Sequence, residues 1–172
     1  FQINGIGNGI SDFLDDTILF ASYAFSKTKP NKNKLGAITP SGMGQASGML
    51  GSEDSKFGSS ISLGVQMPGV FDGDRFGLEY NHGSKYWRSF TYGEDTLVGS
   101  KLAALGNAYE AYYKMPILGE NLTAQLNYIY IDYDYTGSDT FFGWTGTPMK
   151  VEDTPGAIKS AQQIRAQIRY RY

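Results

Sequence analysis

The last stretch of the chain, residues 160–172, alternates strictly between apolar and polar side chains. The apolar positions are Ile164, Ala166, Ile168, Tyr170 and Tyr172, and the polar positions are Gln163, Arg165, Gln167, Arg169 and Arg171. A period of two over this length predicts a β-strand, because a helix would spread both sets around its axis. Such a strand fits a soluble sheet, with its polar face in water, or a transmembrane barrel, with its apolar face in lipid.

Other segments alternate in the same way and predict an all-β chain of about six strands. They are residues 17–26, 57–67, 74–82, 103–115 and 121–135. Residues 1–4 also alternate but are too short to assign on their own. In the segment 121–135 the pattern changes, since Ile129 and Ile131 occupy polar positions and Asp132 occupies an apolar one. A β-bulge or the emergence of the strand from a membrane would explain this change.

The connections between these segments alternate in length. Residues 27–56, 83–102 and 136–159 form long connections, whereas residues 68–73 and 116–120 form short ones. Outer-membrane barrels have long extracellular loops and short periplasmic turns, whereas a sandwich has no reason to sort its loops in this way. We therefore predict a transmembrane antiparallel up-and-down β-barrel, with the three long connections outside and the two short ones in the periplasm.

Composition narrows the chemistry further. The sequence has 22 Gly, 13 Tyr and no Cys, and its net charge of −2 does not indicate a nucleic-acid partner. It contains no apolar run of about 18 residues, but a barrel strand needs only about 9–11 residues to cross a membrane. We find no catalytic triad, metal cluster or nucleotide loop, so we predict neither an enzyme nor a cofactor.

Four segments carry a resemblance to a known family. The terminal strand ending in Tyr172 resembles the terminal strand of Gram-negative outer-membrane proteins. The segments H-G-S-K-Y-W-R-S-F (82–90), G-S-K-L-A-A-L-G-N-A-Y-E-A-Y-Y (99–113) and Y-D-Y-T-G-S (133–138) resemble a family of outer-membrane porin-like proteins of unknown function. The resemblance covers most of residues 57–172, and those relatives are much longer.

The resemblance implies a location in the bacterial outer membrane and a part in a larger barrel. It also implies that Ile164, Ile168, Tyr170 and Tyr172 form a signal read by the barrel-assembly machinery. Residues 1–172 would then be one β-barrel domain or the C-terminal portion of one. Six strands are too few for a closed lipid-facing barrel, and an open edge in lipid is costly, so further strands are expected from residues 1–16, from additional sequence or from other subunits.

The polar face of the predicted strands holds the candidate site residues. The lumen-lining candidates are Glu110, Lys114, Gln163, Arg165, Gln167, Arg169 and Arg171. The arginines would bias a pore towards anions, pair with carboxylates of neighbouring strands such as Glu110, or simply be solvated. For Glu110 and Lys114 themselves, a ladder of salt bridges is expected. Lys27, Lys29, Lys32 and Lys34 would either meet lipopolysaccharide phosphates or be solvated in a loop.

These observations favour a porin-like channel for the passive diffusion of small solutes or ions. The first alternative is a surface interaction protein with a narrow or plugged barrel, and the second is a soluble β-barrel ligand binder. The lipid bilayer is the expected partner in the first two cases. A homo-oligomer is left open.

Overall fold

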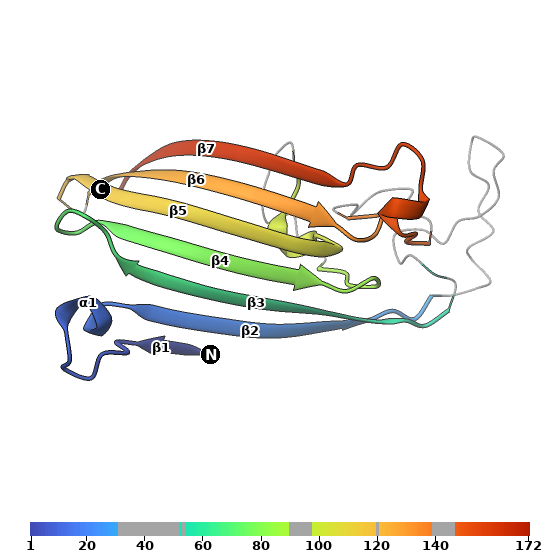
Figure 1. The fold of residues 1–172 in the computed structure, drawn as a ribbon, viewed down its shortest axis with the longest axis horizontal. Coiled ribbons are helices and arrows are strands. Elements are labelled where there is room, and N and C mark those ends of the chain that lie inside the picture. The colour runs from blue at the N-terminus through green and yellow to red at the C-terminus, as the bar shows by residue number, and fades with distance from the viewer. Residues whose placement is uncertain (31–51, 53, 90–97, 120, 139–146) are drawn as a thin grey trace.

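The computed structural model shows a single antiparallel sheet whose seven strands follow one another in chain order (Figure 1). The strands are β1 (Gln2–Asn4), β2 (Ile18–Lys27), β3 (Phe57–Pro68), β4 (Arg75–Gly83), β5 (Gly106–Leu118), β6 (Leu122–Tyr133) and β7 (Ser160–Tyr170). The short helices are α1 (Asp12–Asp15), η3 (Lys101–Ala103) and η4 (Val151–Asp153). The structure describes residues 1–30, 52, 54–89, 98–119, 121–138 and 147–172.

The all-β, up-and-down arrangement predicted from the alternation is confirmed. The six predicted strands are β2 to β7, and residues 2–4 add the short strand β1 at one edge. The largest shift in bounds is in β5, which begins at Gly106 rather than at residue 103 and ends at Leu118. The sheet is open, with β1 and β7 at its two edges, so the structure shows no closed barrel.

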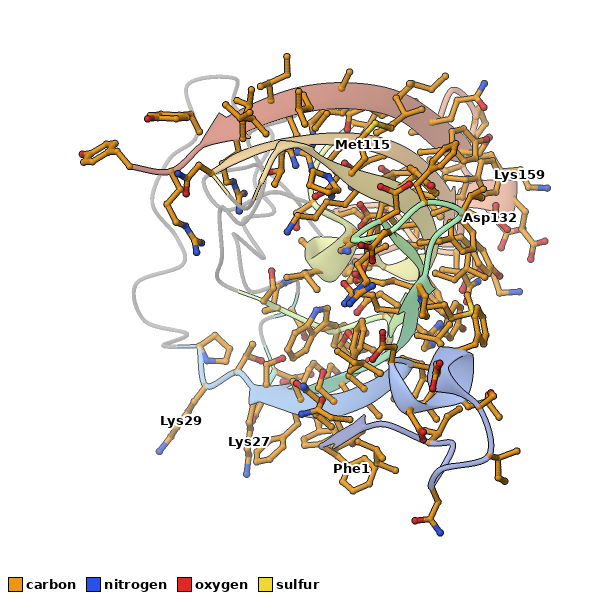
Figure 2. All side chains as sticks on the ribbon, turned by 90° about the vertical axis from the view of Figure 1, so that its left-hand side faces the viewer. Phe1, Lys27, Lys29, Met115, Asp132 and Lys159 are labelled. Carbon is orange, nitrogen blue, oxygen red and sulfur yellow. The ribbon has the colours of Figure 1, made fainter. Side chains whose placement is uncertain are left out.

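Cross-strand register sorts the side chains onto two chemically different faces. On one face, apolar residues of consecutive strands stand opposite one another in a row: Leu19, Val65, Leu78, Ala111, Tyr128 and Ile164. A neighbouring row holds Tyr80, Tyr109 and Tyr130, with ring centroids 5.3 Å apart between Tyr80 and Tyr109 and 6.4 Å apart between Tyr109 and Tyr130. The sheet curves so that this apolar face is convex and the polar face is concave (Figure 2).

The two ends of the sheet differ in their connections. α1 and the short turns after β3 and β5 lie at one end, and the long connections leave from the other (Figure 1). This separation agrees with the predicted long–short alternation. Most of the first long connection lies outside the described residues, as do residues 90–97 and 139–146.

The described part of the connection between β4 and β5 folds against the concave face instead of extending away from the sheet. The indole Nε1 of Trp87 donates to the carbonyl oxygen of Leu102 over 2.7 Å, which fastens the two arms of this connection together. A Cβ atom at Gly58 would lie 2.2 Å from the carbonyl oxygen of Tyr86, so this close approach requires glycine. The sequence predicts residues 83–102 as a long outer connection, and their described part packs against the concave face at the end of the sheet where the long connections leave.

The buried apolar core lies where this connection meets β5 and β6. Ala104, Ala108, Ile129 and Ile131 form one cluster, and Tyr133 packs against it. The register of β6 with both neighbours runs unbroken through Ile129 and Ile131, so no β-bulge explains their positions. They are apolar on the polar face because Ala104 packs against them, and burying them removes apolar surface from water.

Candidate functional site

The polar side chains of the concave face form two groups at different heights along the strands. We call Glu79, Lys101, Glu110 and Asn127 the ion-pair cluster. We call Arg75, Lys114, Arg169 and Arg171 the basic pocket. The first group lies against the folded connection, and the second lies at the end with the short turns.

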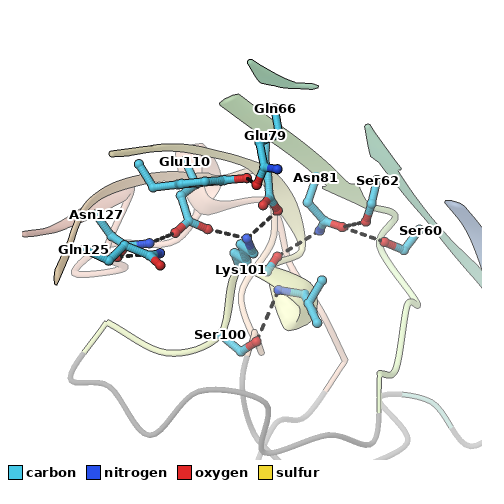
Figure 3. Close-up of polar contacts among 12 residues, drawn as sticks. Ser60, Ser62, Gln66, Glu79, Asn81, Ser100, Lys101, Glu110, Gln125 and Asn127 are labelled. Carbon is cyan, nitrogen blue, oxygen red and sulfur yellow. Dashed lines mark hydrogen bonds and ion pairs between the residues drawn. The ribbon is translucent and has the colours of Figure 1, made fainter. Parts of the chain in front are cut away.

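The ion-pair cluster holds one ammonium group between two carboxylates (Figure 3). Lys101 Nζ donates to Glu79 Oε2 over 2.6 Å and also to Glu110 Oε2. Glu79 and Glu110 are direct cross-strand partners on β4 and β5, an arrangement of like charges that is unfavourable in a sheet. The ammonium group of Lys101 offsets this repulsion, so the connection between the strands supplies the charge that the sheet itself lacks.

The surroundings of Lys101 favour its charged form. Burial by itself lowers the pKa of the ammonium group, but hydrogen bonds to Glu110 and Glu79 and the charges of both carboxylates raise it more, so the pKa lies above its ordinary value. The Glu110 side chain is only 5% exposed, so the pair is shielded from screening by solvent. Lys101 is therefore positively charged at neutral pH and fixed to the sheet.

Neutral polar side chains extend this cluster across the concave face (Figure 3). The Asn127 amide donates to Glu110 Oε1, and Gln125 Nε2 donates to Asn127 Oδ1 over 3.1 Å. On the other side, Asn81 Nδ2 donates to the carbonyl oxygen of Lys101 over 2.8 Å. The buried polar groups thus have partners on both sides, which is what a stable polar network requires.

The basic pocket is a cavity of about 620 Å³ next to the short turns. Arg75 and Lys114 are direct cross-strand partners on β4 and β5, and Arg169 and Arg171 reach the same cavity from β7 and the residues that follow it. Arg75 lies 3.9 Å from Asp16, whereas no carboxylate among the described residues lies within 4.0 Å of Lys114, Arg169 or Arg171. The pocket therefore concentrates positive charge that the described chain leaves largely unpaired.

The predicted concave-face residues separate into these two groups. Glu110 belongs to the ion-pair cluster, and Lys114, Arg169 and Arg171 belong to the basic pocket. Gln163, Arg165 and Gln167 stand on the same face of β7, opposite Ile129, Asn127 and Gln125. Glu110 pairs with Lys101, so the pairing of Glu110 with the terminal arginines and the ladder of Glu110 with Lys114 are both wrong.

The proposed assembly-signal residues take the opposite side of β7. Ile164 and Ile168 are each 73% exposed on the convex face, and Tyr170 follows at the end of the strand. Tyr172 lies beyond β7 and is fully exposed. Lys27 and Lys29 point away from the sheet (Figure 2), whereas Lys32 and Lys34 lie outside the described residues.

Four residues of the two groups were not singled out from the sequence, namely Arg75, Glu79, Lys101 and Asn127. Arg75 shares its alternation with Glu79 on β4, so the period of two could have placed it on the polar face. Lys101 lies in a connection, and no local pattern shows that a loop folds inward. The pairing of two glutamates across β4 and β5 would have indicated a missing cation. That indication requires the register of the two strands, which the sequence alone does not reveal.

No helix among the described residues is long and apolar enough to cross a membrane. In the same part of the chain, no three His, Asp or Glu side chains come together in a way that could hold a metal ion. The concave face therefore presents charged and hydrogen-bonding side chains, gathered in the ion-pair cluster and the basic pocket.

Comparison with known proteins gives a family but no activity. No curated protein and no solved structure matches the chain. One family model matches residues 1–172, and its description is that of a protein of unknown function. The chain with this two-faced sheet therefore belongs to the family DUF3373.

Proposed function

We propose that this chain is part of an outer-membrane β-barrel that serves as a porin-like channel for the passive diffusion of small solutes or ions. The observation that carries the proposal is the continuous apolar row on the convex face, set against charged and amide side chains on the concave face. Large contiguous apolar patches are rare on the surfaces of soluble monomers and mark contact with a membrane or a protein. A lipid-facing exterior and a wet interior account for both faces at once.

Strand length and edge chemistry support the same proposal. β2 to β7 are 9 to 13 residues long, which suits strands that cross a bilayer at a tilt. An open edge is not tolerated in lipid, because each unpaired backbone group costs several kcal/mol. The barrel would be closed by strands from additional sequence or from other subunits.

The folded connection favours a second candidate, a barrel that is narrow or plugged and acts through its surface. Lys101, Trp87 and the apolar residues 104–105 hold this connection against the concave face, where it would reduce the width of a lumen. A soluble ligand binder remains the third candidate, and it requires the convex apolar face to be covered by protein.

Ion conductance separates the first two candidates. The native protein containing this chain is extracted with detergent, purified and added to a planar lipid bilayer. A channel gives stepwise conductance, whereas a plugged barrel inserts without conducting. Recovery of monodisperse protein without detergent would contradict both membrane candidates and favour the soluble one.

A further inference from the structure

The basic pocket has features of a defined binding site rather than of a diffuse stripe of charge. Its lining includes Arg75, Lys114, Arg169 and Arg171 but only one acidic residue, Asp72. The formal charge of this lining is therefore 4 − 1 = +3. Like charges that face one another repel, and Arg75 and Lys114 stand directly opposite each other on β4 and β5, with Asp16, 3.9 Å from Arg75, offsetting part of this repulsion.

We propose that this pocket binds a small oxyanion that carries two or more negative charges, such as a phosphate group or a di- or tricarboxylate. This inference rests on the proposed function, because a channel gives such a solute access to the concave face. A multivalent anion offsets the repulsion within the pocket, whereas one monovalent anion leaves most of it in place.

The chemistry of the donors supports an oxyanion. Arginine presents a planar fork of N–H groups that matches the oxygens of carboxylates and phosphates, and the pocket contains three arginines. Gln66, Asn121 and Thr123 also line the cavity and supply uncharged donors. The cavity of about 620 Å³ lies within the usual range for small-molecule sites, so it accommodates an organic anion as well as inorganic phosphate.

The position of the pocket separates it from the acidic groups of the ion-pair cluster. Lys114 lies four residues beyond Glu110 on the same face of β5, a distance of about 13 Å along the strand. Glu79 and Glu110 both pair with Lys101, and the one negative charge that remains there stays about that far from Lys114. An anion at the short-turn end would therefore meet positive charge and hydrogen-bond donors without passing close to an unpaired carboxylate of that cluster.

Isothermal titration calorimetry on the purified native protein in detergent tests the site directly. The probes are citrate and inorganic phosphate, with acetate as the monovalent control, all at fixed ionic strength. We expect citrate and phosphate to bind and acetate to bind much more weakly. Arg169→Gln should weaken citrate binding by about tenfold to a hundredfold, the contribution of one charge-assisted hydrogen bond. Equal binding of acetate and citrate, or no binding of citrate and phosphate, would overturn the proposal.

Arg165→Gln is the matched control, since Arg165 stands on the same strand and face but does not line the cavity. It removes the same charge and should leave citrate binding nearly unchanged. If it weakens binding as much as Arg169→Gln does, the attraction is diffuse and there is no pocket site. Circular dichroism confirms that both variants are folded. Conductance without citrate binding would support the proposed channel and contradict the proposed anion site. Citrate binding without conductance would support the anion site and contradict the channel.

Discussion

Lys101 Nζ lies 2.6 Å from Glu79 Oε2 and joins the connection between β4 and β5 to the concave face of the sheet. The same ammonium group also pairs with Glu110, the cross-strand partner of Glu79. One ammonium group from a loop thus pairs with two carboxylates from adjacent strands and offsets one of their two negative charges. The fold of the connection and the charge of the concave face are therefore coupled.

Lys101→Met tests this coupling. Without the ammonium group, Glu79 and Glu110 repel each other, so residues 84–105 should detach more readily from the sheet. We expect a loss of up to about 3 kcal/mol in the free energy of unfolding, the lower end for breaking a buried ion pair, because Glu79 is partly exposed. Denaturant unfolding and limited proteolysis within residues 84–105 measure the effect. Lys101→Arg keeps the charge and should lose much less of the free energy of unfolding. Equal losses in both variants would show that packing of the side chain, rather than its charge, stabilises the connection.

The pH dependence of the same contact follows from the raised pKa of Lys101. A cation whose pKa is raised by folding contributes stability that is fully present below its unfolded value, near 10.5, and is lost as the pH rises through the higher folded value. The connection should therefore stay in place from neutral pH to about pH 10 and loosen above it.

The fluorescence of buried Trp87 reports this change in a Trp144→Phe background, which leaves Trp87 as the only tryptophan of this chain. Lys101→Arg keeps its charge at higher pH and should shift the transition upward. An unchanged transition in Lys101→Arg would assign the alkaline change to tyrosine ionisation elsewhere.

The sheet could be predicted from the sequence because its faces differ so sharply in polarity. Along β7, Ile164 and Ile168 alternate with Arg165 and Arg169, and only a strand separates these sets. The short turns after β3 and β5 identify two antiparallel pairs, and the rest of the strand order follows from the expected up-and-down barrel. Even Arg75 could be assigned to the polar face from its spacing to Glu79.

The inward path of the β4–β5 connection could not be predicted in the same way. Ile129 and Ile131 break the alternation of β6 because Ala104 packs against them, and that contact joins segments far apart in the chain. The alternation along a strand shows which face of the sheet a side chain occupies, but it does not show which distant segment packs against that face. For the same reason, the sequence suggests an arginine of β7, and not a residue of a loop, as the partner of Glu110.

Cysteine labelling in whole cells tests which end of the sheet is outside. Val70, in the turn after β3, and Glu152, in the connection before β7, are exposed label sites. An impermeant maleimide should label Glu152→Cys and spare Val70→Cys until the cells are lysed. The reverse pattern would invert the proposed topology.

Arginine substitutions on the convex face of β7 test whether that face meets lipid, because their effect should depend on depth in the bilayer. Ile164 belongs to the central apolar row, with Tyr128 and Ala111, whereas Ile168 lies nearer the short-turn end. An arginine on the lipid side costs roughly 2–4 kcal/mol at the bilayer midplane and about 0–1 kcal/mol near the interface. Ile164→Arg should therefore impair assembly more than Ile168→Arg, as measured by the amount of folded protein in purified outer membranes.

The polar side of β7 supplies the matched control for that series. Arg169→Ile exchanges the same two residue types in the opposite direction, on the concave face, so this variant should assemble normally. It should also shift ion selectivity away from anions, because it removes a fixed positive charge from the lumen. Reversal potentials in a salt gradient measure the shift. Normal assembly of Ile164→Arg together with failure of Arg169→Ile would mean that the convex face does not meet lipid. Normal assembly of Arg169→Ile with unchanged selectivity would mean that this arginine is not part of an ion filter.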